Sequence, residues 1–500
     1  MKPNAGVKWL AAIVSAMMAV LMAEGAGRLV DGFVLGSLAL RPRIETAAPA
    51  APNRPDRRHV AAVRLADGVE PGWYELSPQR EPLQPLTAEQ QARLDRYPTD
   101  PQGAFFVWNP NYLTTQLCNG NRVGSLGILD DFFVFDPVEP GPYPIYRQLA
   151  HFGPPGTFFS NAFGWRGPEL TLAKPPQTVR LAFVGASTTV SSFGASFSHP
   201  ELIAHWLNLW GAQQRPAIRF EAINAGRMGI DSNSIAAIVR QEVVSLAPDM
   251  VIYYEGANQF SPGKALKLPA TLPPSPRSTF PTRWQLEDYS VLARRALTAS
   301  QLIRNGDGAE TRKPDYGTVW PGDVNEQAPD VSRGNLPIDL DIVVRNFDAM
   351  RAELAASGSE FAVSSFIWMV YPGMVLDLRS HLNLYRYLND SYWPASYAHL
   401  RRMADFQNRV FVRYAKLHGL EFLDVAKGFP QDPDLFNDAI HMSEDGLRLQ
   451  AWHYLQILVP IVQARISSGR WPAASRPAAL DPFLPKPRLM SREQLMAPCK

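Results

Sequence analysis

Short apolar runs alternate with longer segments of helical periodicity from about residue 179 to residue 465. The apolar runs are rich in β-branched and aromatic residues, which is typical of buried parallel strands. We predict five strands, at 179–185, 218–226, 249–256, 361–370 and 420–426. Helices are predicted between them, at 232–246, 339–357 and 400–419. This alternation predicts an α/β fold with a parallel sheet that is covered by helices on both faces.

Two long segments interrupt the alternation. Residues 260–336 are rich in proline and polar side chains, and residues 371–397 are crowded with Tyr, Trp, His and Arg. Both follow predicted strand ends, so both should lie over the same edge of the sheet, where long loops contact substrates or form a lid. We therefore expect a main domain at 171–468 that contains both insertions.

The rest of the chain has little regular periodicity. We predict an irregular region at 59–170 that packs on the main domain, and a proline-rich tail at 469–500. Within the irregular region, residues 159–170 combine Asn, Gly, Arg and aromatic side chains, which favours a tight turn docked on the main domain.

Residues 1–58 combine an apolar run with a spacer. The run at 9–23 is shorter than the about 20 apolar residues that a membrane-spanning helix needs, but its flanking residues can extend it. We favour an uncleaved single-pass anchor in a bacterial inner membrane, with the folded part in the periplasm. A cleaved signal peptide and a secreted protein are the alternative, because Ala23 and Gly25 suit a cleavage site. The segment 41–58, rich in Ala, Pro and Arg, is predicted as a semi-rigid spacer.

The composition and net charge of the chain bear on which classes of function it can have. The net charge of +2 gives no reason to expect a nucleic-acid partner. Cys118 and Cys499 form no CxxC or zinc spacing, and the sequence leaves open whether they pair. Histidines such as His199 and His205 are interpreted as packing or helix-surface residues, so no metal is predicted. No cofactor is predicted either, since no GxGxxG motif follows the first strand.

A serine and a histidine–aspartate pair carry the candidate chemistry. Ser187 directly follows the first predicted strand, at the sheet edge where α/β folds bind ligands, and its hydroxyl needs a base to become a nucleophile. Asp438 precedes His441 by three residues, so its carboxylate can bind one ring nitrogen while the other faces the serine. We predict a triad of nucleophile Ser187, base His441 and orienting Asp438. Ser443 is the expected N-cap of the helix that follows.

Three groups are candidates for an oxyanion hole. They are the backbone N–H of Ser187, the backbone N–H of Gly226 after the second strand, and the side-chain amide of Asn258 after the third. Gly226 lacks a Cβ, so its N–H can approach the space above the serine. Together these groups would stabilise the charge that develops when an acyl carbonyl is attacked.

Four sequence blocks occur in order at the strand ends: GASTT around Ser187, NAG ending at Gly226, GAN ending at Asn258, and DAIH from Asp438 to His441. Over roughly residues 160–465 the chain resembles the SGNH (GDSL-type) hydrolase superfamily, especially its membrane-anchored bacterial members. The resemblance implies a three-layer α/β/α flavodoxin-like fold and a serine esterase with the residue roles given above.

The chain departs from that family's pattern at two positions. Ala186 replaces the aspartate of GDS, and Gln259 replaces the aspartate that often follows the asparagine of the third block. Neither position has a role in the triad, so these departures bear on subfamily and substrate. An α/β-hydrolase is disfavoured because Thr189 takes the place of the final glycine of GxSxG.

Three functions remain open. The leading hypothesis is an esterase or deacylase that hydrolyses an O-acyl ester of an envelope glycan, a lipid or a small molecule. The second is an O-acyltransferase that modifies an exported polysaccharide, with a sugar hydroxyl in place of water. The third is a catalytically silent envelope binding protein, for which the aromatic segment 371–397 would stack on sugars.

Overall fold

The computed structural model describes residues 5–30, 57–79, 159–191, 195–274, 316–377 and 380–473, together with short stretches such as 131–134, 308–310 and 488–491. Cys118, Cys499, most of the predicted spacer at 41–58 and most of the tail at 469–500 lie outside the described residues.

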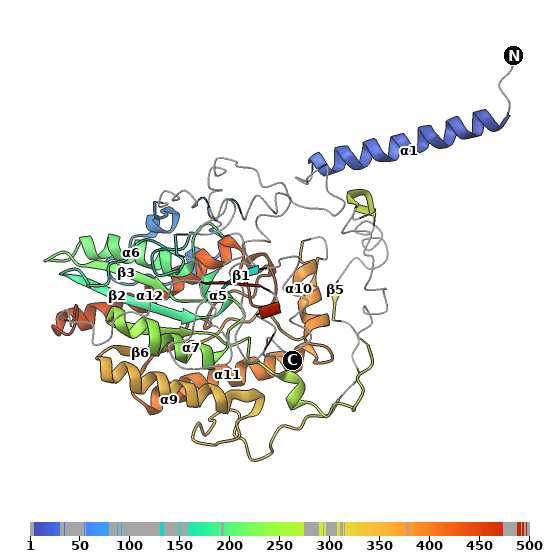
Figure 1. The fold of residues 1–500 in the computed structure, drawn as a ribbon. Coiled ribbons are helices and arrows are strands. Elements are labelled where there is room, and N and C mark those ends of the chain that lie inside the picture. Colours follow the sequence, from blue (N-terminus) through green and yellow to red (C-terminus); the bar gives the residue numbers. More distant parts are fainter. Residues whose placement is uncertain are drawn as a thin grey trace.

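A five-stranded parallel sheet forms the centre of the main domain (Figure 1). The strands are β2 (Thr178–Gly185), β3 (Arg219–Asn224), β4 (Met250–Tyr254), β6 (Glu360–Ser364) and β8 (Glu421–Leu423). Their order in the sheet is β3-β2-β4-β6-β8. Numbered along the chain, this is the flavodoxin-like order 2-1-3-4-5, which changes direction between the first and third strands. All five predicted strands are confirmed.

The prediction for the last part of the fourth strand is wrong. β6 ends at Ser364, whereas an apolar strand to residue 370 was expected. The residues that follow remain buried, with Phe366, Ile367 and Trp368 each at most 4% exposed. Phe366 packs on Tyr254 of β4 and Trp368 packs on Phe260. A hydrophobic pattern does not distinguish such a buried segment from a strand.

Helices cover both faces of the sheet. On one face lie α6 (His199–Ala212) and α12 (Glu444–Ser467); on the other lie α7 (Ser232–Ile238), α9 (Leu340–Ser357) and α11 (Tyr397–Leu417). Consecutive residues of β4 show the two layers. The ring of Tyr253 packs on Phe347 of α9, whereas the ring of Tyr254 packs on Tyr454 of α12. The predicted arrangement of helix layers on both sides of a sheet is therefore confirmed.

Shorter elements complete the described chain. The helix predicted at 232–246 is α7 continued by η4 (Val239–Val243) and η5 (Val244–Leu246). The insertion at 371–397 contains α10 (Leu382–Arg386) and η9 (Tyr387–Ser391), and a four-residue helix, α5 (Ser187–Val190), follows β2. β1 (Asp131–Val134) pairs antiparallel with β9 (Arg488–Ser491), and β5 (Gly308–Ala309) pairs with β7 (Val375–Leu376).

The described part of the N-terminal region packs on α6 and α12. The ring of Tyr74 contacts Trp206 and Trp452, and all three side chains are at most 1% exposed. Arg448 of α12 donates a hydrogen bond of 2.7 Å to the Tyr74 carbonyl. Residues far apart in the sequence therefore share one core.

The first helix, α1 (Ala5–Val30), projects from the rest of the protein in Figure 1. Its side chains are described from Val14 onward. Glu24 joins it to another segment, since its carboxylate accepts hydrogen bonds from Ser290 Oγ at 2.8 Å and from the Val291 N–H at 2.9 Å. Within the described part of the chain, no helix has the length and apolarity needed to cross a membrane.

Candidate active site

Ser187, His441 and Asp438 meet at the carboxyl edge of the sheet, as the sequence predicted. Ser187 Oγ lies 2.8 Å from His441 Nε2, although the two residues are 254 positions apart in the chain. His441 Nδ1 lies 2.7 Å from Asp438 Oδ2. A hydroxyl, an imidazole and a carboxylate at these distances can pass a proton from the serine to the histidine. Ser187 is largely buried, with 8% exposure.

The loop before α12 holds the histidine and the aspartate. Asp438 Oδ1 accepts hydrogen bonds from the backbone N–H groups of Ile440 at 2.9 Å and His441 at 2.8 Å. Ser443 caps α12, accepting from the N–H of Gly446 at 3.2 Å. A Cβ on Gly446 would lie 2.0 Å from the Leu435 carbonyl oxygen, so this close approach requires glycine. The loop is therefore fixed before any substrate binds.

The turn that carries Ser187 is tied to β4. Thr189 Oγ1 donates a hydrogen bond of 2.9 Å to the Tyr254 carbonyl. A Cβ on Gly185 would lie 2.1 Å from Thr189 Oγ1 and 2.2 Å from the Tyr254 oxygen, so only glycine allows this contact. Ser187 is the first residue of α5, where a backbone N–H has no helical acceptor. Its N–H is therefore available to a ligand oxygen.

Arg166 holds the far side of the same turn, a role that the sequence did not reveal. Its guanidinium donates to the carbonyl of Ser191, to that of Val190 at 3.2 Å and to that of Ala195 at 2.8 Å. It also binds the Glu201 carboxylate at 3.0 Å. Ser191 has a left-handed backbone, with φ of 55°, which is uncommon for a residue other than glycine. The segment 159–170 thus includes the docked turn that was expected, and its arginine stabilises the backbone directly after the candidate nucleophile.

The two other predicted oxyanion donors lie at neighbouring strand ends but are engaged with protein acceptors. The N–H of Gly226 donates to Asn224 Oδ1 at 3.2 Å, and Asn258 Nδ2 donates to the Ile230 carbonyl at 2.7 Å. The amide of Asn258 has a second hydrogen, whereas the N–H of Gly226 has one. The N–H of Ser187 is therefore the more available of the two backbone donors. To bind an oxyanion, the N–H of Gly226 must divide its hydrogen bond between Asn224 and the ligand oxygen, or leave Asn224.

Asn224 connects the turns after β2 and β3. Its Nδ2 donates to the Thr189 carbonyl at 3.0 Å while its Oδ1 accepts from Gly226. A Cβ on Gly226 would lie 2.6 Å from the Val190 nitrogen, so this glycine packs directly on the turn of the candidate nucleophile. Gly226 was predicted as a donor because the absence of a Cβ lets its N–H approach the serine. The structure shows that its close packing on the serine turn also requires glycine.

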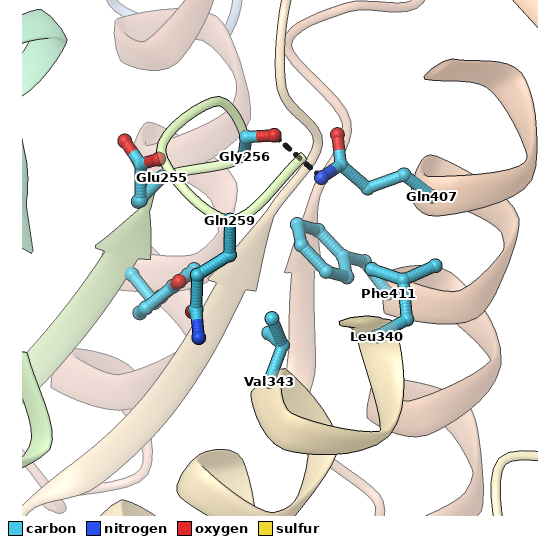
Figure 2. Close-up of a pocket in the computed structure, with 8 residues that line it drawn as sticks. Glu255, Gly256, Gln259, Leu340, Val343, Gln407 and Phe411 are labelled. Atoms are coloured by element: carbon cyan, nitrogen blue, oxygen red, sulfur yellow. Dashed lines mark hydrogen bonds between the residues drawn. The ribbon is translucent and has the colours of Figure 1, made fainter. Parts of the chain in front are cut away.

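The loop after β4 contains a buried carboxylate, Glu255, that the sequence analysis did not single out. Burial raises the pKa of Glu255 from 4.5 to about 7, because removal from water disfavours the charged form. Figure 2 shows this loop beside Gln407 of α11, around a small cavity of about 10 Å³. Gln259, at the second position that departs from the family pattern, accepts a hydrogen bond of 2.9 Å from the Ser232 N–H. It therefore has a structural contact of its own.

The insertion at 371–397 lies against the site. Burial, together with the negative charges of Asp438 and Glu255, raises the pKa of the Tyr387 hydroxyl to about 12, although a hydrogen bond with Tyr392 lowers it. The ring of Tyr387 packs on Tyr392, which also contacts Trp368 with centroids 6.0 Å apart. Much of the aromatic surface is thus used in packing. Within the described part of the chain, no group of three or more His, Cys, Asp or Glu side chains could hold a metal.

Comparisons with known proteins give only remote matches. No protein-family model and no curated protein sequence matches the chain. The chain is similar to an acetyl xylan esterase with a TM-score of 0.31 and 12% identity, over 56% of this chain and 100% of the other. It is also similar to a GDSL-like lipase from Bacteroides thetaiotaomicron, with a TM-score of 0.29 and 13% identity over 60% and 93% of the two chains. An acetylxylan esterase from Geobacillus stearothermophilus gives 0.32 and 13% over 56% and 94%. At such low values, the case for an activity rests on the contacts of the site itself.

Proposed function

We propose that the protein is a serine esterase or deacylase of the SGNH type, acting on an O-acyl ester of an envelope glycan, a lipid or a small molecule. One observation carries the proposal: Ser187 Oγ lies 2.8 Å from His441 Nε2, while Asp438 binds the opposite ring nitrogen at 2.7 Å. Each contact is short. A silent binding protein has no need to keep this arrangement.

The reaction proceeds in two halves. Ser187 Oγ attacks the ester carbonyl carbon as its proton passes to His441 Nε2, and the carbonyl oxygen becomes an oxyanion that the Ser187 N–H receives. The bond to the alcohol oxygen then breaks, and the imidazolium gives its proton to that oxygen. Water attacks the acyl-serine by the same route, releasing the acid and restoring the hydroxyl. Asp438 keeps the imidazole in the tautomer that accepts from the serine.

An O-acyltransferase is the second candidate, because the same acyl-serine can be resolved by a sugar hydroxyl in place of water. The insertion at 371–397 favours this candidate. The negative charges of Asp438 and Glu255 raise the pKa of its Tyr387, which indicates that the Tyr387 hydroxyl lies near both carboxylates. Tyrosines near the candidate site suit a glycan acceptor, since aromatic faces pack on sugar rings.

We also propose that the protein is held at the inner membrane by its N-terminal segment, with the candidate site in the periplasm. The apolar run at 9–23 and the exposed side chains of Met17, Val20 and Leu21 on α1 support this. Carbonate-washed membranes should retain the full-length protein. Release of the full-length chain would contradict an anchor, and a soluble form starting near Glu24 would indicate a cleaved signal instead.

The activity test uses purified full-length protein and 4-nitrophenyl acetate. We expect release of nitrophenolate by the wild type and none above background by Ser187→Ala. Addition of an acetylatable oligosaccharide then separates the two candidates: an esterase produces acetate, whereas an acyltransferase produces acetylated glycan. Absence of both products would contradict the proposed function.

A further inference from the structure

Glu255 is the first residue after β4, and its side chain is buried, with 3% exposure. One carboxylate oxygen, Oε1, accepts two backbone hydrogen bonds, from Ala257 at 2.7 Å and from Asn258 at 2.6 Å. Both donors belong to the turn that carries the side-chain amide of Asn258. The carboxylate therefore closes this turn from the inside.

Neutral groups hold the outside of the turn. Gln407 Nε2 donates to the Gly256 carbonyl at 2.6 Å (Figure 2). Asn258 Nδ2 donates to the Ile230 carbonyl at 2.7 Å. A Cβ on Gly256 would lie 2.7 Å from the ring of Phe366, so the backbone itself is packed. With its exterior fixed, the turn depends on Glu255 for its two inward N–H groups. A carboxylate makes stronger hydrogen bonds to such donors than a neutral acceptor does.

The surroundings of Glu255 contain no compensating cation within the described part of the chain. The ionisable groups that face it are acids: Asp231, which caps α7, and the tyrosines at 253, 254, 387 and 392. The side chains that α9 and α11 bring to the adjacent cavity, including Leu340, Val343, Gln407 and Phe411, are uncharged. A buried carboxylate without a cation costs stability, which indicates a use beyond folding.

We propose that Glu255 is a positioning residue of the oxyanion site, whose carboxylate holds the backbone at 257–258 so that Asn258 presents its free amide hydrogen to the reacting ester. This role rests on the proposed serine-esterase function. Glu255 itself does not touch the substrate. It acts through the conformation of the turn.

The proposal predicts opposite effects of Glu255 ionisation on activity and on stability. Its pKa of about 7 means that the carboxylate, and hence the ordered turn, is present above pH 7 and is lost as the pH falls through that value. The contribution of Glu255 to stability has the opposite dependence on pH. Because the pKa is raised above 4.5, this group's favourable contribution to folding is present below pH 4.5 and is lost as the pH rises through about 7.

The experiment compares wild type, Glu255→Gln and Glu360→Gln as full-length proteins with 4-nitrophenyl acetate. Gln keeps the side-chain shape and one acceptor oxygen but removes the charge. Glu360 begins β6 at the opposite edge of the sheet, so its variant is the matched control. At pH 8 we expect Glu255→Gln to lower kcat about 10-fold, less than the 10²–10³ for a lost oxyanion donor, with KM changed less than about 2-fold. Its melting temperature at pH 8 should rise, and that of the control should not.

The pH profile supplies the second readout. Wild type and the control should lose kcat more steeply on the acid side than Glu255→Gln, by about one unit of slope in log kcat against pH, because the Glu255 carboxylate is protonated as the pH falls through about 7. Equal profiles, or a variant that is both slower and less stable at pH 8, would overturn the positioning role while leaving esterase activity in place. An inactive wild type would instead overturn the proposed function, and this role with it. If Glu255→Gln does not fold, Glu255→Asp, which keeps the charge, should retain the steeper acid-side profile at lower kcat.

Discussion

Asp438 accepts two hydrogen bonds from one residue, His441: its Oδ2 lies 2.7 Å from the ring Nδ1 and its Oδ1 lies 2.8 Å from the backbone nitrogen. The carboxylate therefore fixes both the ring and the loop that carries it. Asp438→Asn places an amide where the ring needs an acceptor, which favours the wrong tautomer. We expect kcat to fall about 10⁴-fold with folding preserved. A variant with near wild-type kcat would show that the aspartate does not orient the base.

Asn258 tests the oxyanion site. Its amide already donates to Ile230, and its second hydrogen is the one assigned to the transition state. Asn258→Ala should lower kcat about 10²–10³-fold with little change in KM. Asn233→Ala, at an exposed position of α7, is the control and should leave kcat unchanged. Equal kcat values for the two variants would remove Asn258 from the site.

Gly226 tests the packing under the serine turn. A Cβ there would lie 2.6 Å from the Val190 nitrogen and 2.9 Å from Thr189 Cβ, so backbone must move to admit it. Gly226→Ala should lower the free energy of unfolding by about 1–3 kcal/mol, measured by urea denaturation, and should also reduce turnover. Gly322→Ala adds a Cβ with no atom within 4 Å and should be neutral. Equal stabilities of the two variants would contradict this packing.

Arg166 tests whether the backbone after the nucleophile needs support. Lysine keeps the charge but lacks the planar fork that reaches Val190, Ala195 and Glu201 together. Arg166→Lys should reduce kcat about 10- to 100-fold by displacing the serine turn. Arg345→Lys alters an arginine with 62% exposure on α9 and should have no effect on kcat. An unchanged kcat in Arg166→Lys would show that turnover does not depend on the support that Arg166 gives to the serine turn.

The strands and the contact between Asp438 and His441 could be predicted because their signals are local. Each strand lies in a largely apolar run, and Asp438 and His441 are close enough in sequence for their pairing to follow from spacing. The position of Ser187 at the end of β2 then brings it to the same sheet edge. His441 lies 254 positions further along the chain, and it reaches Ser187 because the parallel strands end at the same edge of the sheet.

Other features depend on contacts that the sequence pattern does not encode. The role of Arg166 arises from carbonyls more than 20 positions away, and an isolated arginine gives no sign of them. The present acceptors of Gly226 and Asn258 depend on side-chain orientation, which a motif does not specify. Glu255 is the residue that could have been found, since a glutamate directly after a buried strand is an unusual place for a charge.

The central claim is that Ser187 is the nucleophile activated by His441. Its most direct test is covalent labelling of the full-length protein with a fluorophosphonate, followed by mass mapping of the modified peptide. We predict one label per chain, on Ser187, with loss of esterase activity in proportion to labelling. Labelling should be absent in Ser187→Ala and strongly slowed in His441→Ala, and the double variant should be no less active than either single one. A label on another residue, or turnover that survives Ser187→Ala, would contradict the account.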